Sequence, residues 1–164
     1  MGKIVIISAT SHKNLTLAKN IKLILNELGS ESEVLNLEEV DLPLYTPIKH
    51  GPNDKIDVLS EKFKNSEGFI FCSPEYNGGV APILSNVLSW ISVTTDGWRD
   101  GFCGKFALIC THSGGSGWRF LAAFRSQLEH LGTNVLARTI SVSNHKPLNG
   151  DSAKLILKEL VDHV

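Results

Sequence analysis

The chain has 164 residues, a formal net charge of −1 and 42% hydrophobic residues, a length and composition that suit one domain with its own buried core. The near-neutral charge and the scattered basic residues argue against a nucleic-acid partner or an anionic membrane surface. No apolar run approaches the roughly 20 residues of a membrane span, and the run after Met1-Gly2-Lys3 is too short for a signal peptide. We therefore expect a single cytoplasmic domain over residues 1–164.

Short apolar runs alternate with amphipathic stretches along the chain. The runs are rich in β-branched and aromatic residues, as strands are, and the stretches between them repeat apolar residues at helical spacing. The expected strands are residues 3–8, 33–37, 69–72, 105–110, and 134–138 or 134–142. The expected helices begin at Asn14 or Thr16, at Asn53 or Asp54, at Pro82, before Leu121 and before Ile156. This alternation predicts an α/β fold whose five parallel strands fit the order 2-1-3-4-5.

The most distinctive stretch runs from Phe69 to Trp90, with the sequence FIFCSPEYNGGVAPILSNVLSW. A buried strand ends at Cys72, and residues 73–79 form a loop with many exposed backbone donors. Pro82 suits a first helical turn because its missing N–H is not needed there. Ligands of open α/β sheets bind where such loops leave the carboxyl ends of the strands. The stretch therefore predicts a ligand-binding loop.

This stretch resembles the signature of the NAD(P)H-dependent FMN reductase family, which includes soluble quinone, chromate and azo-dye reductases. The matching residues are Ser73-Pro74-Glu75-Tyr76-Asn77-Gly78, Pro82, Leu84, Asn86 and Trp90. Two helix positions depart from the signature, since Ser85 replaces its lysine and Ser89 its aspartate. The resemblance implies a flavodoxin-like three-layer sandwich, bound FMN, and NADPH or NADH as the co-substrate.

Loops after the first, third and fourth expected strands share one edge of such a sheet. The first loop holds hydroxyl and amide donors at a helix start, where a phosphate binds well, although Thr10 or Asn14 equally suits a plain helix cap. The resemblance carries over Thr10 and Asn14 as phosphate ligands and places His12 where the family has an arginine. Histidine is only partly charged near neutral pH, so His12 changes the expected pH dependence of phosphate binding.

The other two loops are candidates for contact with the flavin ring. The resemblance implies that the backbone from Pro74 to Gly78 faces the isoalloxazine, and a plain Asn-Gly turn is the alternative. Residues 113–117 include three glycines, which let the backbone approach a planar ligand, and a flexible surface turn is the alternative. The predicted cofactor-binding residues are Ser8, Thr10, His12, Asn14, Leu15, Pro74, Glu75, Tyr76, Asn77, Gly78, His112, Ser113, Gly114, Gly115 and Gly117.

Other chemistries lack their motifs. No G-x-S-x-G frames a nucleophilic serine, and Phe106 stands where a P-loop needs a hydroxyl after Gly104-Lys105. The six histidines include no short-spaced pair suited to a metal, so no metal site is expected. The three cysteines, at 72, 103 and 110, are expected to be buried as small apolar residues. We name no catalytic residue, because the flavin itself carries the chemistry.

The sequence thus predicts an FMN-containing oxidoreductase that passes two electrons from NAD(P)H to a quinone or similar small-molecule acceptor. One alternative enzyme uses free FMN as its substrate. The non-enzyme alternatives are a flavin-binding regulatory module and a flavodoxin-type electron carrier, and the near-neutral charge disfavours the carrier because flavodoxins tend to be acidic. The resemblance also implies a homodimer or homotetramer paired through the helix after Pro82, where Tyr76, Trp90 and Trp98 either anchor the partner or pack internally.

Overall fold

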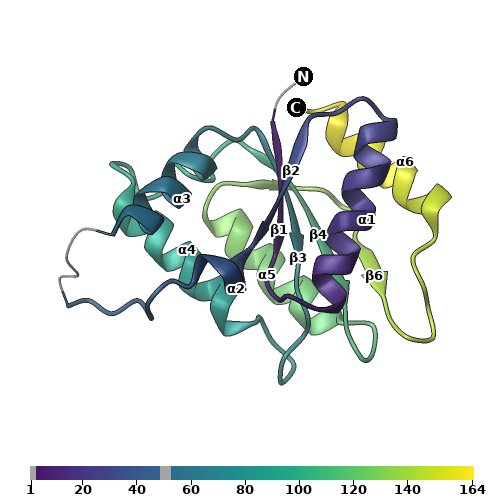
Figure 1. Ribbon diagram of the computed structural model, residues 1–164, viewed down its shortest axis with the longest axis horizontal. Coiled ribbons are helices and arrows are strands. Elements are labelled where there is room, and N and C mark those ends of the chain that lie inside the picture. Colours follow the sequence, from purple (N-terminus) through teal and green to yellow (C-terminus); the bar gives the residue numbers. More distant parts are fainter. Residues whose placement is uncertain (1–2, 49–52) are drawn as a thin grey trace.

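The computed structural model describes residues 3–48 and 53–164, so Met1, Gly2 and His50 lie outside the description. The strands are β1 (Ile4–Ser8), β2 (Ser32–Asn36), β3 (Gly68–Cys72), β4 (Phe106–His112), β5 (Asn134–Val135) and β6 (Ile140–Val142). The helices are α1 (Lys13–Glu27), α2 (Leu37–Val40), α3 (Asp54–Lys64), α4 (Pro82–Thr94), α5 (Trp118–His130) and α6 (Gly150–Val161). The strands form a parallel sheet in the order β2-β1-β3-β4-β5, and β6 also pairs with β4 (Figure 1). The predicted fold class and strand order are confirmed.

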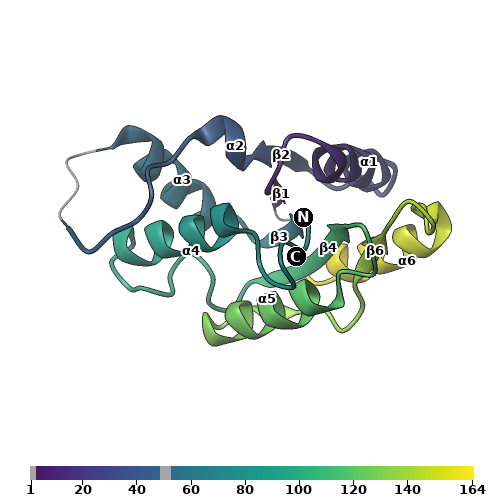
Figure 2. The same ribbon diagram turned by 90° about the horizontal axis from the view of Figure 1, so that it is seen from below.

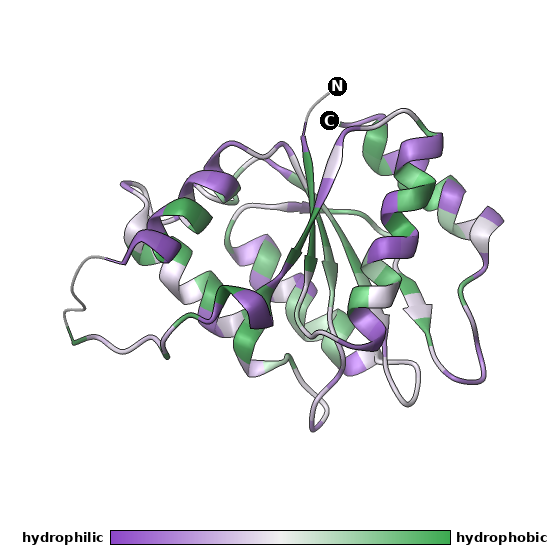
Figure 3. Ribbon diagram, viewed as in Figure 1, coloured by the Kyte–Doolittle hydropathy of each residue, from purple (hydrophilic) through white to green (hydrophobic). Residues whose placement is uncertain are grey.

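Helices cover both faces of the sheet, which gives the molecule three layers (Figures 1 and 2). Alternate residues of β3 show how the sequence builds both cores, since neighbouring side chains of a strand point to opposite faces. Phe69 and Phe71 pack in an aromatic core under α3, α4 and α5. Ile70 and Cys72 pack in an aliphatic core under α1 and α6. The central strands are accordingly apolar along their length, and the helices carry their polar residues outward (Figure 3).

The structure corrects several expected boundaries. The fifth strand is split, because residues 136–139 leave the sheet between β5 and β6. β6 pairs with residues 110–112, so β4 runs two residues further than expected, to His112. The short helix α2 begins at Leu37, the last residue of the expected strand 33–37, and is capped by the Asn36 side chain. β2 lies at the sheet edge, as the predicted strand order requires, and four of its five residues are half-buried.

The prediction that all three cysteines are buried was only partly correct, and the structure decides between the two alternatives for Trp90. Cys72 and Cys110 are buried side by side on β3 and β4, and burial raises the pKa of the Cys110 thiol. Cys103 is exposed, contrary to expectation, because it lies in the turn before β4 rather than on the strand. Trp90 is buried and its indole N–H donates to the Pro43 carbonyl oxygen at 2.7 Å, which confirms the internal-packing alternative for this residue.

Residues 3–48 and 53–164 lack two kinds of structural feature. In this part of the chain no three His, Cys, Asp or Glu side chains are grouped as a metal site would require. The helices of the same residues include none with the length and apolar character of a bilayer-spanning segment.

Candidate functional site

The carboxyl ends of β1, β3 and β4 bring the three predicted loops to one edge of the sheet, at the lower end in Figure 1. Backbone hydrogen bonds continue from the strands into the loops. The Ala9 N–H donates to the Cys72 carbonyl at 2.9 Å, and the Ser73 N–H donates to the Cys110 carbonyl at 3.1 Å. Each loop therefore leaves the sheet in a position fixed by its neighbour.

The first loop connects β1 to α1. The buried Ser8 hydroxyl donates to the Thr10 carbonyl at 2.8 Å and so shapes the turn from inside. α1 begins at Lys13, one residue before the earliest expected start, and its N-cap residue His12 makes no side-chain capping bond. The first N–H groups of a helix have no partner within the helix. The start of α1 is thus a backbone donor site without a side-chain cap from its N-cap residue.

Asn14 lies in the first turn of α1 but neither caps it nor faces solvent. Its side-chain amide donates to the His112 carbonyl at 3.0 Å and its oxygen accepts from the His112 N–H at 2.9 Å. Asn14 is 2% exposed, so this paired contact is a buried link between α1 and the end of β4. The His112 Nε2 atom is also buried, and within the described part of the chain it has no hydrogen-bond partner. Leu15, the neighbouring predicted residue, is half-buried.

The second loop contains a two-residue hairpin turn. Tyr76 and Gly79 exchange backbone hydrogen bonds of 2.9 and 3.3 Å, and the central residues Asn77 and Gly78 have φ of 50° and 71°. Positive φ at both central positions defines a type I′ turn, which Asn-Gly favours. The plain-turn alternative is therefore correct in geometry. It is compatible with ligand binding, because the turn leaves Tyr76 50% exposed at the sheet edge.

Glu75 ties the second loop to the third. Its backbone N–H donates to the Ser113 hydroxyl oxygen at 2.8 Å. Its carboxylate accepts from the backbone N–H groups of Arg119 and Phe120 at 3.0 and 3.1 Å, in the first turn of α5. The N-cap position of α5 is a glycine without a side chain, so Glu75 supplies the missing cap.

The third loop has open space around two of its glycines. A Cβ built on Gly114 or Gly115 would meet no atom within 4 Å. Gly117 is different, since its φ is 66° and a Cβ there would lie 2.8 Å from the Thr111 side chain. The hydroxyls of Thr111 and Ser113 are hydrogen-bonded at 2.7 Å beneath it. The loop therefore has a fixed base and an open rim, which fits a flat ligand.

The helix starts at this edge differ in their ability to hold an anion. The Glu75 carboxylate already occupies the start of α5, and α4 begins with Pro82, which has no N–H. The start of α1 has no side-chain cap. A phosphate is held by unpaired N–H groups and the helix dipole, so the α1 start fits the phosphate of FMN and the two glycine-containing loops fit its ring.

One functional candidate was missed by sequence reasoning. The Glu38 carboxylate of α2 accepts a 2.7 Å hydrogen bond from the Ser11 backbone N–H, in the middle of the first loop. Its position after β2, which is next to β1 in the expected strand order, was the available signal.

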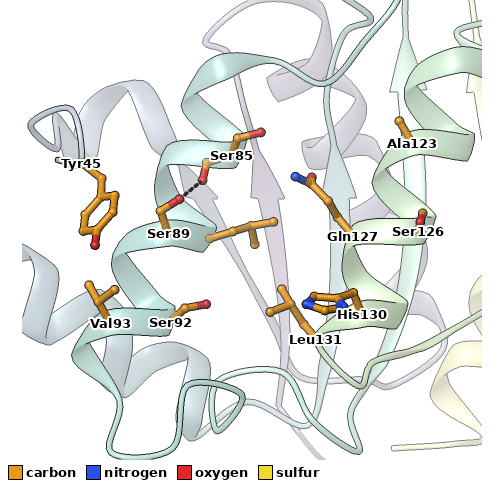
Figure 4. Close-up of a pocket in the computed structure, with 11 residues that line it drawn as sticks. Tyr45, Ser85, Ser89, Ser92, Val93, Ala123, Ser126, Gln127, His130 and Leu131 are labelled. Carbon is orange, nitrogen blue, oxygen red and sulfur yellow. Dashed lines mark hydrogen bonds between the residues drawn. The ribbon is translucent and has the colours of Figure 1, made fainter. Parts of the chain in front are cut away.

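A separate cavity of about 620 Å³ lies between α4 and α5 (Figure 4). None of the predicted cofactor-binding residues lines it. Ser85 and Ser89, the two departures from the family signature, do line it, and the Ser89 hydroxyl donates to the Ser85 carbonyl at 3.0 Å. The opposite wall includes Ala123, Gln127 and other residues of α5.

Known proteins support the resemblance. The chain is 31% identical over 100 residues to "NADPH-dependent FMN reductase ArsH" of Rhizobium meliloti, a match that covers 61% of this chain and 40% of that protein. The chain spans about half or less of the length of the curated relatives it matches. Their activities therefore bear on this chain only as proposals.

Solved structures show the same fold. The flavoenzyme NAD(P)H:(acceptor) oxidoreductase FerB of Paracoccus denitrificans superposes with a TM-score of 0.78 at 18% identity, over 99% of this chain and 97% of that one. The apo form of NADH:FMN oxidoreductase EMOB gives a TM-score of 0.79 at 16% identity, over 100% and 91% of the two chains. The family model described as NADPH-dependent FMN reductase matches residues 2–147. The chain belongs to the NADPH-dependent FMN reductase family.

Proposed function

We propose that the chain is one FMN-binding domain that acts as an NAD(P)H-dependent oxidoreductase. Two features at the same end of the sheet carry this proposal. The start of α1 has no side-chain cap, and the third loop has open space above Gly114 and Gly115 and a hydrogen bond between Thr111 and Ser113 at its base. Membership of the family supports both FMN and NAD(P)H as the molecules used. A cytoplasmic location stays a prediction.

The phosphate end of the site is assigned to the first loop. Ser8 shapes the turn, Thr10 offers a hydroxyl, and His12 and Leu15 contribute backbone at the helix start. Asn14 is assigned a positioning role, because its amide is bonded to the His112 backbone. It holds the α1 start against β4 rather than contacting the phosphate with its side chain.

The ring end is assigned to the second and third loops. Residues 74–78 lie along one side, and residues 113–117 supply the open glycine rim. Bound FMN would supply the site with hydride acceptance from a nicotinamide and two-electron transfer to a second substrate. The protein's part is to orient the ring and leave one face accessible, which Gly114 and Gly115 do because no side chain covers them.

We further propose a quinone or similar flat small molecule as the electron acceptor. Tyr76 and Trp118 are 50% and 59% exposed beside the second and third loops, where a flat ring has surfaces to stack on. The Paracoccus denitrificans protein FerB is an NAD(P)H:(acceptor) oxidoreductase, which is consistent with this class of reaction.

Anaerobic reduction tests the proposed function. Protein loaded with FMN should be bleached by NADPH or NADH in one two-electron step with little semiquinone, and a quinone should restore the colour. If neither nucleotide reduces the flavin while dithionite yields a stable semiquinone, the electron-carrier alternative replaces this proposal. If FMN at micromolar concentration changes neither its spectrum nor its fluorescence, flavin binding itself is wrong.

Self-association through α4 and α5 is also proposed, with a second copy of this chain as the partner. Five of the eleven residues that line the cavity between these helices are serine or alanine, whose small side chains let another helix approach, and Val93 in the same lining is 55% exposed. Light scattering should give a dimer or tetramer mass at micromolar concentration, and Ala123→Arg should give a monomer. A monomer mass for the unchanged chain would contradict the proposal.

A further inference from the structure

The Glu38 side chain forms a hydrogen bond to the first loop from outside that loop. Its Oε2 atom accepts the Ser11 N–H at 2.7 Å, across 27 residues of sequence. Ser11 has a second contact with this part of the chain, since the Asn36 amide donates to its hydroxyl oxygen at 3.0 Å. The contact is therefore built by two elements, β2 and α2, that lie beside the first loop but outside it.

The carboxylate is charged at neutral pH. Hydrogen bonds from the Ser11 hydroxyl and backbone N–H, and to a smaller extent the nearby His12, hold the pKa of Glu38 below its usual value. Glu38 is exposed, so its side chain has room to move away from the loop. Glu39, the next residue, bonds instead to the Asn36 amide at 2.9 Å.

A flavin phosphate carries its own negative charge to the same loop. The start of α1, to which the phosphate is assigned, begins two residues after Ser11. Two anions that share a donor-rich loop and one adjacent histidine repel each other, and they compete for the same positive potential. Riboflavin has the same ring but no phosphate, so Glu38 does not repel it in this way.

We propose that the Glu38 carboxylate competes with the flavin phosphate for the first loop. This competition lowers the affinity for FMN and keeps FMN exchangeable. The inference rests on the proposed function and deepens it. An exchangeable FMN is compatible with the proposed electron transfer to a quinone, and it makes the FMN-loaded fraction of the protein depend on the concentration of free FMN.

The test compares two variants with two flavins by titrating flavin fluorescence. Glu38→Gln removes the charge and keeps the shape, and Glu39→Gln is the matched control one residue away. We expect Glu38→Gln to bind FMN about tenfold more tightly and to change riboflavin affinity less than about twofold, an increment that corresponds to one charge pair near a protein surface. Glu39→Gln should change neither affinity by more than about twofold.

Glu38→Asp separates charge from shape. It keeps the negative charge on a shorter side chain, so FMN affinity should not rise as it does in Glu38→Gln. Circular dichroism and thermal unfolding of each variant establish that the fold is intact before its titration is interpreted.

Two results would overturn the inference. If Glu38→Gln weakens FMN or leaves it unchanged, Glu38 is a loop brace or has no influence on the phosphate. If FMN and riboflavin tighten equally, the effect does not involve the phosphate. Failure of the unchanged chain to bind either flavin is a distinct result, because it removes the proposed function before Glu38 is considered.

Discussion

Two glutamates lie against backbone N–H groups at the same edge of the sheet, and they differ in what they leave free. Glu75 accepts two N–H groups in the first turn of α5 and replaces the missing cap of that helix. Glu38 accepts one N–H in the loop before α1 and leaves the start of that helix without a side-chain cap. The same kind of hydrogen bond therefore caps α5 in the case of Glu75, whereas in the case of Glu38 it leaves the start of α1 open to a ligand. An anionic ligand belongs where the cap is missing.

The largest expected loss of stability is that of Glu75→Ala, which removes the side-chain cap of α5. Each hydrogen bond to a charged group contributes about 1.5–3 kcal/mol, and the partial exposure of Glu75 favours the low end, so the two bonds together give about 3 kcal/mol. Thermal unfolding should shift down by about 9 °C, and both flavins should bind more weakly. Glu75→Gln keeps an acceptor oxygen and should lose less. A decrease in unfolding temperature of less than about 2 °C in Glu75→Ala would show that the Glu75 hydrogen bonds contribute little to stability.

Lys105→Met is the matched control for Glu75→Ala at the opposite edge of the sheet. The Lys105 ammonium donates to the carbonyls of Phe63, Lys64 and Ser66, with the distances 2.6, 2.6 and 2.5 Å, and so closes the end of α3. Its loss should lower the unfolding temperature while the affinity for both flavins in the folded protein stays the same. An equal loss of flavin affinity would show that general destabilisation explains the Glu75→Ala result.

Asn14→Ala should have the next largest effect. It leaves the His112 N–H and carbonyl without their partner in a buried position, which costs about 1–3 kcal/mol. Because the link holds α1 against β4, FMN and riboflavin should weaken together, and equilibrium unfolding in urea should show the loss of stability. A loss confined to FMN would instead identify Asn14 as a direct phosphate ligand.

Thr10→Val should act on the phosphate alone. Thr10 is 7% exposed, so valine keeps the packing and removes only the hydroxyl. FMN should bind about tenfold more weakly, equal to about 1.4 kcal/mol, while riboflavin is unchanged. Thr10→Ser retains the hydroxyl and should bind FMN nearly as the unchanged chain does. Equal losses of FMN and riboflavin would mean that Thr10 only shapes the loop.

The smallest effect is the pH dependence of the Glu38 contact. Hydrogen bonds from Ser11 lower the pKa of Glu38 in the folded chain, so the contact stabilises the fold above the unfolded pKa of about 4.3. This contribution is lost as the pH falls from about 4.3 through the lower folded pKa. The stability difference between the chain and Glu38→Gln, at most about 1 kcal/mol, should therefore shrink below about pH 4.3. A difference that is constant down to pH 2 would contradict this assignment.

The sequence allowed the strands and the main helices to be predicted because their signals are local, and the strand order followed from their alternation along the chain. Pro82 at a helix start and the alternating faces of β3 follow from neighbouring residues alone. The contacts of Glu38 and Asn14 are different, since they join residues 27 and 98 positions apart and depend on how the elements pack. Cys103 was misjudged because an apolar strand begins three residues later, which made a turn residue look like part of it.

The Asn14–His112 link has a consequence for the order in which the protein folds. It joins positions 98 residues apart, whereas β1, β2 and β3 all lie within the first 72 residues and can pair before β4 is present. Long-range contacts form late because the entropy of closing the intervening chain must be lost first. A refolding chain should thus regain much of its far-ultraviolet circular dichroism before it regains flavin binding. During synthesis, a nascent chain without β4 lacks the contact that holds the start of α1 in place.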